Sequence, residues 1–281
     1  MNISEAYKIY DTNVIKFTGL KHKTSQNYRT ASVSFIKCIG DLPLEIISLD
    51  TIILWKQAMD REGKQATTIK ANLLVMRKVI QYYKDHGVQT FDPRDIDMPK
   101  LRKRKPVWLN YEEVKCIIDA ATNARDRAIL GLLFSTGCRI SEMLNLNVGD
   151  VRSCDEPMVC GKGDRYRPVY IDVHARNYLN VYLETRTDNF KPLFLSGQRA
   201  RITVARVEQI VHECTLRAGI DKRVTPHTFR HSTLTDYIIN EAPMAMVQKI
   251  AGHANIQTTI NTYTHLQDTD VKKTVKKYHS A

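Results

Sequence analysis

Residues 136–142 have the sequence Thr-Gly-Cys-Arg-Ile-Ser-Glu and follow an apolar segment. We predict a hydrophobic helix from about Arg125 to Ser135 that ends at Gly137, since glycine is favoured just past the last turn of a helix. The two charged residues of the stretch, Arg139 and Glu142, therefore follow directly on a buried element.

A second polar cluster, residues 225–231, has the sequence Thr-Pro-His-Thr-Phe-Arg-His. Thr225 is expected to cap a helix with Pro226 in its first turn. A third cluster is Ala-Gly-His at 251–253, and Tyr263 follows His253 by ten residues.

A β-hairpin is predicted over residues 157–171, between the first two clusters. Gly161-Lys162-Gly163 supplies its turn, and the alternation of Arg165, Arg167, Val169 and Ile171 is typical of a strand. Further helices are predicted around 174–186, 203–217, 226–240 and 243–251.

The charge of the chain favours a polyanionic partner. Its 42 Lys and Arg against 30 Asp and Glu give a net charge of +12 and a pI of about 9.4. Up to residue 99 there are 14 basic and 11 acidic residues, so 28 basic and 19 acidic residues follow. Nucleic acid is the first partner expected from this excess, and an anionic membrane surface is the second.

No apolar run approaches the roughly 18 residues of a membrane-spanning helix, and the N-terminus lacks an apolar signal-peptide core. We therefore expect a cytoplasmic protein without a membrane partner. The six cysteines lie far apart with no C-x-x-C spacing, so reduced thiols, no metal site and no cofactor are expected.

Residues 1–98 are predicted to form a helical domain of four helices. An apolar stripe from Ile3 to Phe17 predicts the first, and a second follows Ser25. Ser48 and Thr67 are expected to cap the third and fourth.

A proline-containing basic linker is predicted over residues 99–106, where like charges and prolines oppose regular structure. It is either a solvated connection or a strap that lies along a phosphate backbone. A second domain then spans residues 107–281 and begins with a capping box formed by Asn110 and Glu113.

Taken singly, these polar residues have ordinary structural interpretations. His227 and His231 lie one helical turn apart, but no glutamate lies between them and no third ligand has helical spacing, so a zinc site is not indicated. Arg139 alone is a salt-bridged or surface arginine, and Tyr263 alone is a half-buried tyrosine.

Taken together, the clusters resemble the tyrosine recombinase (phage integrase) family. Residues 136–142 are similar to the family's T-G-x-R-x-S-E, residues 161–163 to its G-K-G hairpin, and residues 250–253 to its L-G-H. The size is similar to Xer-type members and mobile-element integrases. The resemblance implies a mainly α-helical fold with a small β-sheet, in which a SAM-like four-helix core-binding domain and a mixed α/β catalytic domain form a C-shaped clamp.

The resemblance also implies the site. Tyr263 is the nucleophile, Glu142 supports the first arginine, and Lys162 is the general acid. The other catalytic residues are Arg139, His227, Arg230 and His253. The residues expected to contact DNA are Lys100, Arg102, Lys103, Arg104, Lys105, Arg165 and Arg167.

These residue types suit DNA strand exchange on chemical grounds. A tyrosine can hold the cut phosphate as an ester, so bond energy is conserved. Two arginines can bind the non-bridging oxygens of the transition state with their planar forks, in place of divalent metals. His227 lies one turn from Arg230 and can accept the tyrosine proton.

For such a family member we expect double-stranded DNA recombination sites as partners. A homo-tetramer is expected on synapsed DNA and a monomer or dimer off it, with residues 266–281 docking on a neighbouring protomer. The product would pass through a 3′-phosphotyrosyl link and a Holliday junction, in element integration or excision or in Xer-like dimer resolution. The alternatives are a type IB topoisomerase and a non-catalytic DNA-binding protein on the same fold.

Overall fold

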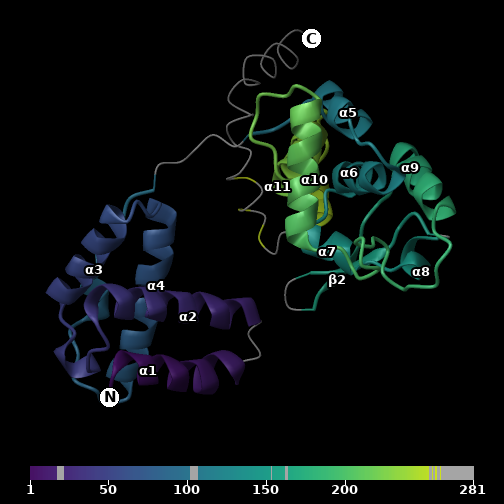
Figure 1. Cartoon of the computed structure of the whole chain (residues 1–281). Helices are drawn as coiled ribbons and strands as arrows, with labels where there is room; N and C mark the ends of the chain where they lie inside the picture. Colours follow the sequence, from purple (N-terminus) through teal and green to yellow (C-terminus); the bar gives the residue numbers. More distant parts are fainter. Residues whose placement is uncertain are drawn as a thin grey trace, which may run out of the picture. The chain divides into compact units, whose positions relative to one another are not determined.

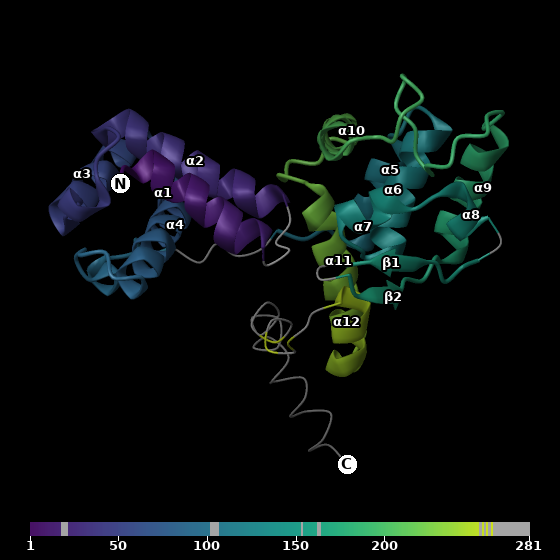
Figure 2. The same cartoon turned by 90° about the horizontal axis from the view of Figure 1, so that it is seen from below.

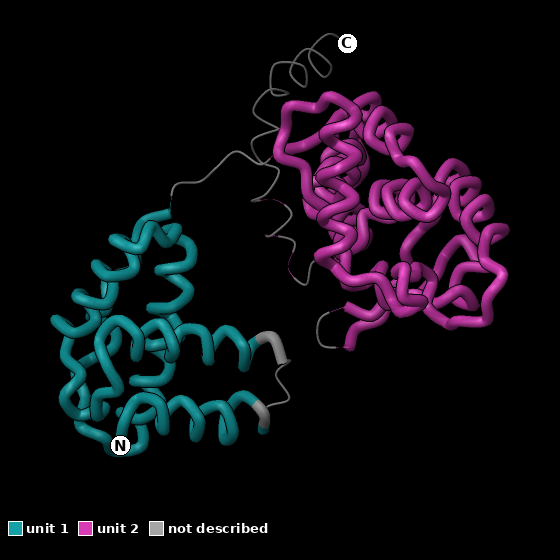
Figure 3. The backbone as a smooth tube through the Cα atoms, in the orientation of Figure 1, with its two compact units in different colours: residues 1–104 teal, residues 105–281 magenta. Residues whose placement is uncertain are grey.

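A computed structural model gives the fold and describes residues 1–17, 22–101, 107–152, 154–161, 164–252, 255, 257 and 260. The chain divides into two compact units, Met1–Arg104 and Lys105–Ala281 (Figure 3). The predicted linker, residues 99–106, contains this division, and its residues 102–106 lie outside the described part.

Unit 1 is built from helices around an aromatic and aliphatic core (Figure 1). Phe35 and Trp55 are fully buried and meet edge to face with ring centroids 5.3 Å apart. The main helices are α1 (Ile3–Tyr10), α2 (His22–Ile39), α3 (Leu49–Arg61) and α4 (Ala66–Asp85). Short turns of other helix types are η1 (Asp11–Lys16), η2 (Leu44–Ile46) and η3 (Pro93–Asp95).

The first predicted helix does not keep α geometry to its end. After Tyr10 it continues as a π-helix, in which each turn holds more residues than an α turn. The apolar stripe therefore loses its phase: Ile15 is buried, whereas Phe17, expected on the stripe, is 89% exposed.

The starts of two other helices differ from the prediction. Ser48 caps α3 as expected and accepts from the Thr51 amide. The predicted cap of the fourth helix, Thr67, instead lies in the first turn of α4. The N-cap residue is Gln65, whose backbone is extended and whose side chain makes no capping hydrogen bond. Helix α2 begins at His22, before Ser25.

Unit 2 has the long apolar helix α6 (Ala124–Thr136) at its centre, with α9 (Val173–Glu184) and α11 (Pro226–Ile239) packed against it (Figure 1). Its sequence is apolar on nearly every side because it is covered nearly all round. The other helices are α5 (Tyr111–Asp119), α7 (Ile140–Asn145), α8 (Val148–Val151), α10 (Val204–Arg217) and α12 (Met244–Ala251).

The predicted hairpin is present as two antiparallel strands, β1 (Met158–Cys160) and β2 (Tyr166–Pro168). Val159 pairs with Arg167, and Val169, which follows β2 on the same face as Arg167, is buried. Figure 2 shows the hairpin beside α7 and α12 at the end of α11. The expected mainly helical fold with a small sheet is confirmed.

No helix in the described part of the chain is long and apolar enough to cross a membrane. The cysteines carry free thiols: Cys138 and Cys214 are buried, and Cys116 and Cys154 are exposed.

Candidate active site

The end of α6 fixes where Arg139 lies. Gly137 ends the helix in the left-handed region, at φ 54°, and Arg139 is the N-cap residue of α7. The Arg139 amide donates to Glu142 Oε2 (2.8 Å), so the backbone at the start of α7 and the Glu142 side chain hold each other.

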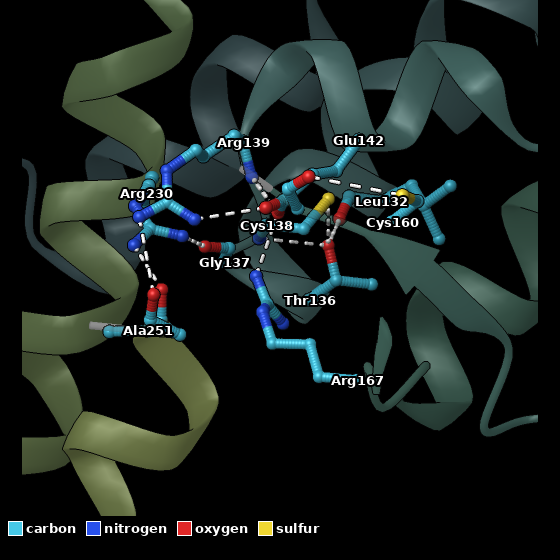
Figure 4. Close-up of polar contacts among 12 residues, drawn as sticks. Leu132, Thr136, Gly137, Cys138, Arg139, Glu142, Cys160, Arg167, Arg230 and Ala251 are labelled. Atoms are coloured by element: carbon cyan, nitrogen blue, oxygen red, sulfur yellow. Dashed lines mark hydrogen bonds and ion pairs between the residues drawn. The ribbon is translucent and has the colours of Figure 1, made fainter. Parts of the chain in front are cut away.

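Glu142 is a buried carboxylate shared by two arginines (Figure 4). Its side chain is 2% exposed; Oε1 accepts from Arg139 Nη1 at 2.9 Å and Oε2 from Arg167 Nη2 at 2.7 Å. A buried carboxylate stays charged at low cost only with such partners, so Glu142 fixes the orientation of both guanidinium groups.

Arg230 approaches the same place from α11. Thr233, one turn further along α11, donates to the Phe134 carbonyl (2.5 Å) and holds α11 against the end of α6. Arg230 Nη1 donates to the Gly137 carbonyl (2.6 Å) and Nη2 to the Ala251 carbonyl (2.5 Å) (Figure 4).

Arg139 and Arg230 converge on the C-terminus of α12. Arg139 Nη2 donates to the Gly252 carbonyl (3.3 Å), next to the Ala251 carbonyl that Arg230 binds. The partial negative charge of a helix C-terminus favours cations, so α12 helps to hold both arginines.

Positive charge exceeds negative charge in this cluster. Arg230 is 4% exposed, and its burial, followed by the repulsion of Arg139 and Arg167, lowers its pKa to about 10. It therefore remains protonated at neutral pH. The cluster contains three guanidinium groups, those of Arg139, Arg167 and Arg230, and one carboxylate, and this excess of donors favours an anion with several acceptor oxygens.

The two histidines of α11 have different surroundings. His231 is buried, whereas His227 keeps an exposed surface. Partial burial of the His227 imidazole, followed by the charges of Arg230 and Arg139, lowers its pKa below the usual 6.5. His227 is therefore neutral at pH 7 and can accept a proton.

A groove of about 1130 Å³ opens beside this cluster. Arg139 and Glu142 line it together with residues of the hairpin and of α12, among them Arg165, Arg167 and Lys249. Arg165 and Lys249 are exposed, and so is Lys100 in unit 1. Within unit 2, the basic side chains of Arg165 and Lys249 thus reach the surface beside the groove that Arg139 lines.

The structure does not describe every residue that the sequence singled out. Lys162, His253 and Tyr263 lie outside the described residues, as do Arg102, Lys103, Arg104 and Lys105. In the described part no three His, Cys, Asp or Glu side chains are grouped in a way that could hold a metal ion.

Arg167 lies in a place that sequence reasoning missed. The sequence predicted that Arg167 contacts DNA, but its side chain is only 14% exposed and is paired with Glu142. One signal was available: in a strand that alternates, Arg167 shares its face with the apolar Val169.

The comparisons with known proteins agree with this geometry. Residues 107–270 match the phage integrase family. This chain belongs to that family. The tyrosine recombinase XerD of Oceanobacillus iheyensis is 30% identical to this chain over 278 residues, which cover 93% of each chain.

Solved structures have the same fold. XerA recombinase is 26% identical, with 98% of each chain covered and a TM-score of 0.56. A lambda integrase tetramer bound to a Holliday junction is 18% identical, with a TM-score of 0.76 over 91% of this chain and 78% of the lambda chain. This member of the phage integrase family is a site-specific tyrosine recombinase. The topoisomerase and the non-catalytic DNA-binding protein are not favoured.

Proposed function

We propose that this recombinase cuts and rejoins double-stranded DNA through a covalent 3′-phosphotyrosyl link at Tyr263. The freed 5′-hydroxyl attacks the equivalent link in a partner duplex, and the first exchange gives a Holliday junction. Because each ester bond replaces another, the reaction needs neither ATP nor a metal ion. The same cycle serves either of two roles: the integration and excision of a mobile element, or the resolution of chromosome dimers.

The convergence of Arg139 and Arg230 carries this proposal. They come from α7 and α11, lie against adjacent carbonyls at the end of α12, and exceed the single carboxylate Glu142 in charge. Guanidinium groups that are held in place before the reaction can stabilise the charge that develops on the non-bridging oxygens of a phosphate.

The remaining roles follow from the family motifs. Lys162 donates a proton to the leaving 5′ oxygen, His227 accepts the proton of Tyr263, and His253 donates a hydrogen bond to a phosphate oxygen. The lowered pKa of His227 supports its part, because only the neutral imidazole can take up a proton.

Binding and assembly are part of the same proposal. Residues 1–98 and the linker 99–106 bind duplex DNA together with residues 107–281, closing a clamp around it in the cytoplasm. Four copies assemble on two sites, each docking residues 266–281 on a neighbour. The lambda integrase tetramer, whose fold this chain shares, supports such an assembly.

Covalent trapping tests the proposed chemistry. Selection from a randomised duplex library gives the preferred binding site, and this site is then built as a nicked duplex. Cleavage near the nick releases a short fragment with the new 5′-hydroxyl, so the reverse reaction cannot occur and the adduct accumulates. We expect the full-length protein to form an adduct in EDTA that survives denaturation, and peptide mapping to find the DNA on Tyr263.

The matched controls are two tyrosine substitutions. Tyr263→Phe should bind the selected duplex with unchanged affinity and form no adduct. Tyr111→Phe removes an exposed phenol of α5, away from the cluster, and should form the adduct at the wild-type rate. An adduct with Tyr263→Phe, or none with wild-type protein bound to its selected site, would overturn the proposal.

A further inference from the structure

The surroundings of Arg167 are those of an internal connector. Its Nη2 donates to Glu142 at 2.7 Å, and its Nη1 is also buried, without a hydrogen-bond partner in the described part of the chain. Two positions earlier, Arg165 is exposed. A phosphate of a bound duplex can therefore reach Arg165 from solvent, whereas the Arg167 guanidinium faces inward.

Arg167 also lies against the end of α12. A Cβ atom placed at Gly252 would overlap the Arg167 side chain, so this glycine leaves the space that the arginine fills. The Gly252 carbonyl in turn accepts from Arg139. Arg167 thus touches two elements that hold Arg139: the Glu142 carboxylate and the α12 terminus.

The hairpin is the third element in this connection. Arg167 is part of β2 and pairs in register with Val159 of β1. A Cβ atom at Gly161 would approach Glu142 Oε1 to 3.3 Å, so the hairpin backbone also passes close to the carboxylate. In the sequence, Lys162 follows Gly161 directly and His253 follows Gly252 directly.

We propose that Arg167 is a positioning residue for strand cleavage and not a DNA contact. By binding Glu142 it fixes the carboxylate that orients Arg139, and it joins the hairpin and the end of α12 to that arginine. The inference rests on the proposed function, since it concerns the rate of the same phosphoryl transfer. It replaces the expectation that Arg167 binds a phosphate.

The first test separates positioning from DNA contact. Full-length wild type and Arg167→Gln are compared for duplex affinity at several salt concentrations and for single-turnover cleavage of the nicked site at saturating protein. We expect affinity within about twofold of wild type, an unchanged salt slope, and cleavage about 10–100-fold slower, as for other residues that orient a binding group.

Rescue and coupling make the role specific. Arg167→Lys keeps one charged donor toward Glu142 and should recover part of the rate. Glu142→Gln alone should also slow cleavage. Adding Arg167→Gln to that variant should slow cleavage by less than about twofold more, because the carboxylate through which Arg167 acts has already been replaced by a neutral amide.

The matched control is Arg186→Gln. Arg186 is 8% exposed and bound to Asp188 at 2.6 Å, in a loop outside the cluster. It should lower the temperature of unfolding while the folded protein cleaves at the wild-type rate. If Arg167→Gln behaves in the same way, its role is structural only and the proposal fails.

Two further outcomes would also contradict the proposed role of Arg167. A salt slope lowered by about one, with cleavage unchanged at saturation, would make Arg167 a phosphate contact. Multiplicative effects of the Glu142 and Arg167 substitutions would show that they act separately. If wild type forms no adduct, the proposed chemistry fails, whereas the affinity and salt slope of Arg167→Gln still report whether Arg167 touches DNA.

Discussion

Two donor atoms of Arg230, Nη1 and Nη2, bind the backbone carbonyls of Gly137 and Ala251, and the residue is 4% exposed. Arg230→Lys keeps a charge but cannot span both carbonyls and a phosphate, because an ammonium group lacks the planar fork. We expect single-turnover cleavage to fall by about 10²–10³-fold, by analogy with the loss of one oxyanion-hole donor. Quenched-flow cleavage of the nicked site measures this rate.

The control for Arg230 is Arg186→Lys, which makes the same change at a buried arginine outside the cluster. It should leave the cleavage rate within about twofold of wild type. Urea unfolding of Arg230→Lys should also show a loss of about 1–3 kcal/mol if one carbonyl loses its donor. If Arg230→Lys cleaves at the wild-type rate, the planar guanidinium group of Arg230 is not required for cleavage.

His227 makes the reaction sensitive to pH. As the proton acceptor it must be neutral, so cleavage should slow as pH falls through its lowered pKa, and the midpoint of the acid limb should lie below 6.5. Cleavage at subsaturating DNA, measured between about pH 5 and 8, reports the free enzyme. His227→Gln should be slow throughout and lack this limb; an unchanged limb would assign the proton to another group.

The same pKa makes a prediction for stability. The unfolded chain binds a proton at His227 more readily than the folded chain, so folding stability rises with pH from the lowered pKa up to about 6.5. Below that window the full penalty applies. Urea unfolding of wild type across this range should show the dependence, and His227→Gln should reduce it.

At the scale of elements, the end of α12 depends on the lack of a side chain at Gly252. The residue has φ +60°, and a Cβ atom there would also overlap Arg167. Gly252→Ala should therefore slow cleavage through Arg167 and lower the unfolding free energy by about 1 kcal/mol or more. Gly63→Ala is the matched control: its φ is +71° but no atom lies near, so it should destabilise unit 1 without slowing cleavage by folded protein.

Helix ends were predictable where one side chain decides them. Asn110 with Glu113 and Thr225 with Thr228 form capping boxes, so α5 and α11 begin where the sequence indicated. The start of α4 was not, because Gln65 makes no side-chain cap bond. The π-helix after Tyr10 was not predicted either; it buries Ile15, a residue that the predicted α-helical stripe did not include.

The site was predictable only in part for a related reason. Arg139 and Arg230 stand in motifs whose residue types and order indicate the chemistry. The pairing of Glu142 with Arg167 joins residues 25 positions apart in the chain. Period-two alternation places Arg167 on an inward face, but only the packed hairpin brings it to that carboxylate.

At the scale of the whole molecule, the net charge of +12 predicts binding dominated by phosphate contacts. A protein that neutralises about 6–10 phosphates loses about 10³–10⁵-fold in affinity between roughly 50 and 200 mM salt, because counterions are released on binding. We expect a loss of this order for the full chain on its selected duplex, measured by fluorescence anisotropy.

Two substitutions separate local contact from total charge. Arg165→Gln removes an exposed charge beside the groove and should lower the salt slope by about one. Arg186→Gln removes the same charge from a side chain that is 8% exposed and already paired with Asp188, so the slope should not change. Equal slopes for the two variants would mean that net charge, rather than contact at the groove, governs binding. If affinity stays constant from about 50 to 200 mM salt, the phosphate backbone is not the main partner. Each phosphate that the protein neutralises releases counterions, and this release must weaken binding as the salt concentration rises.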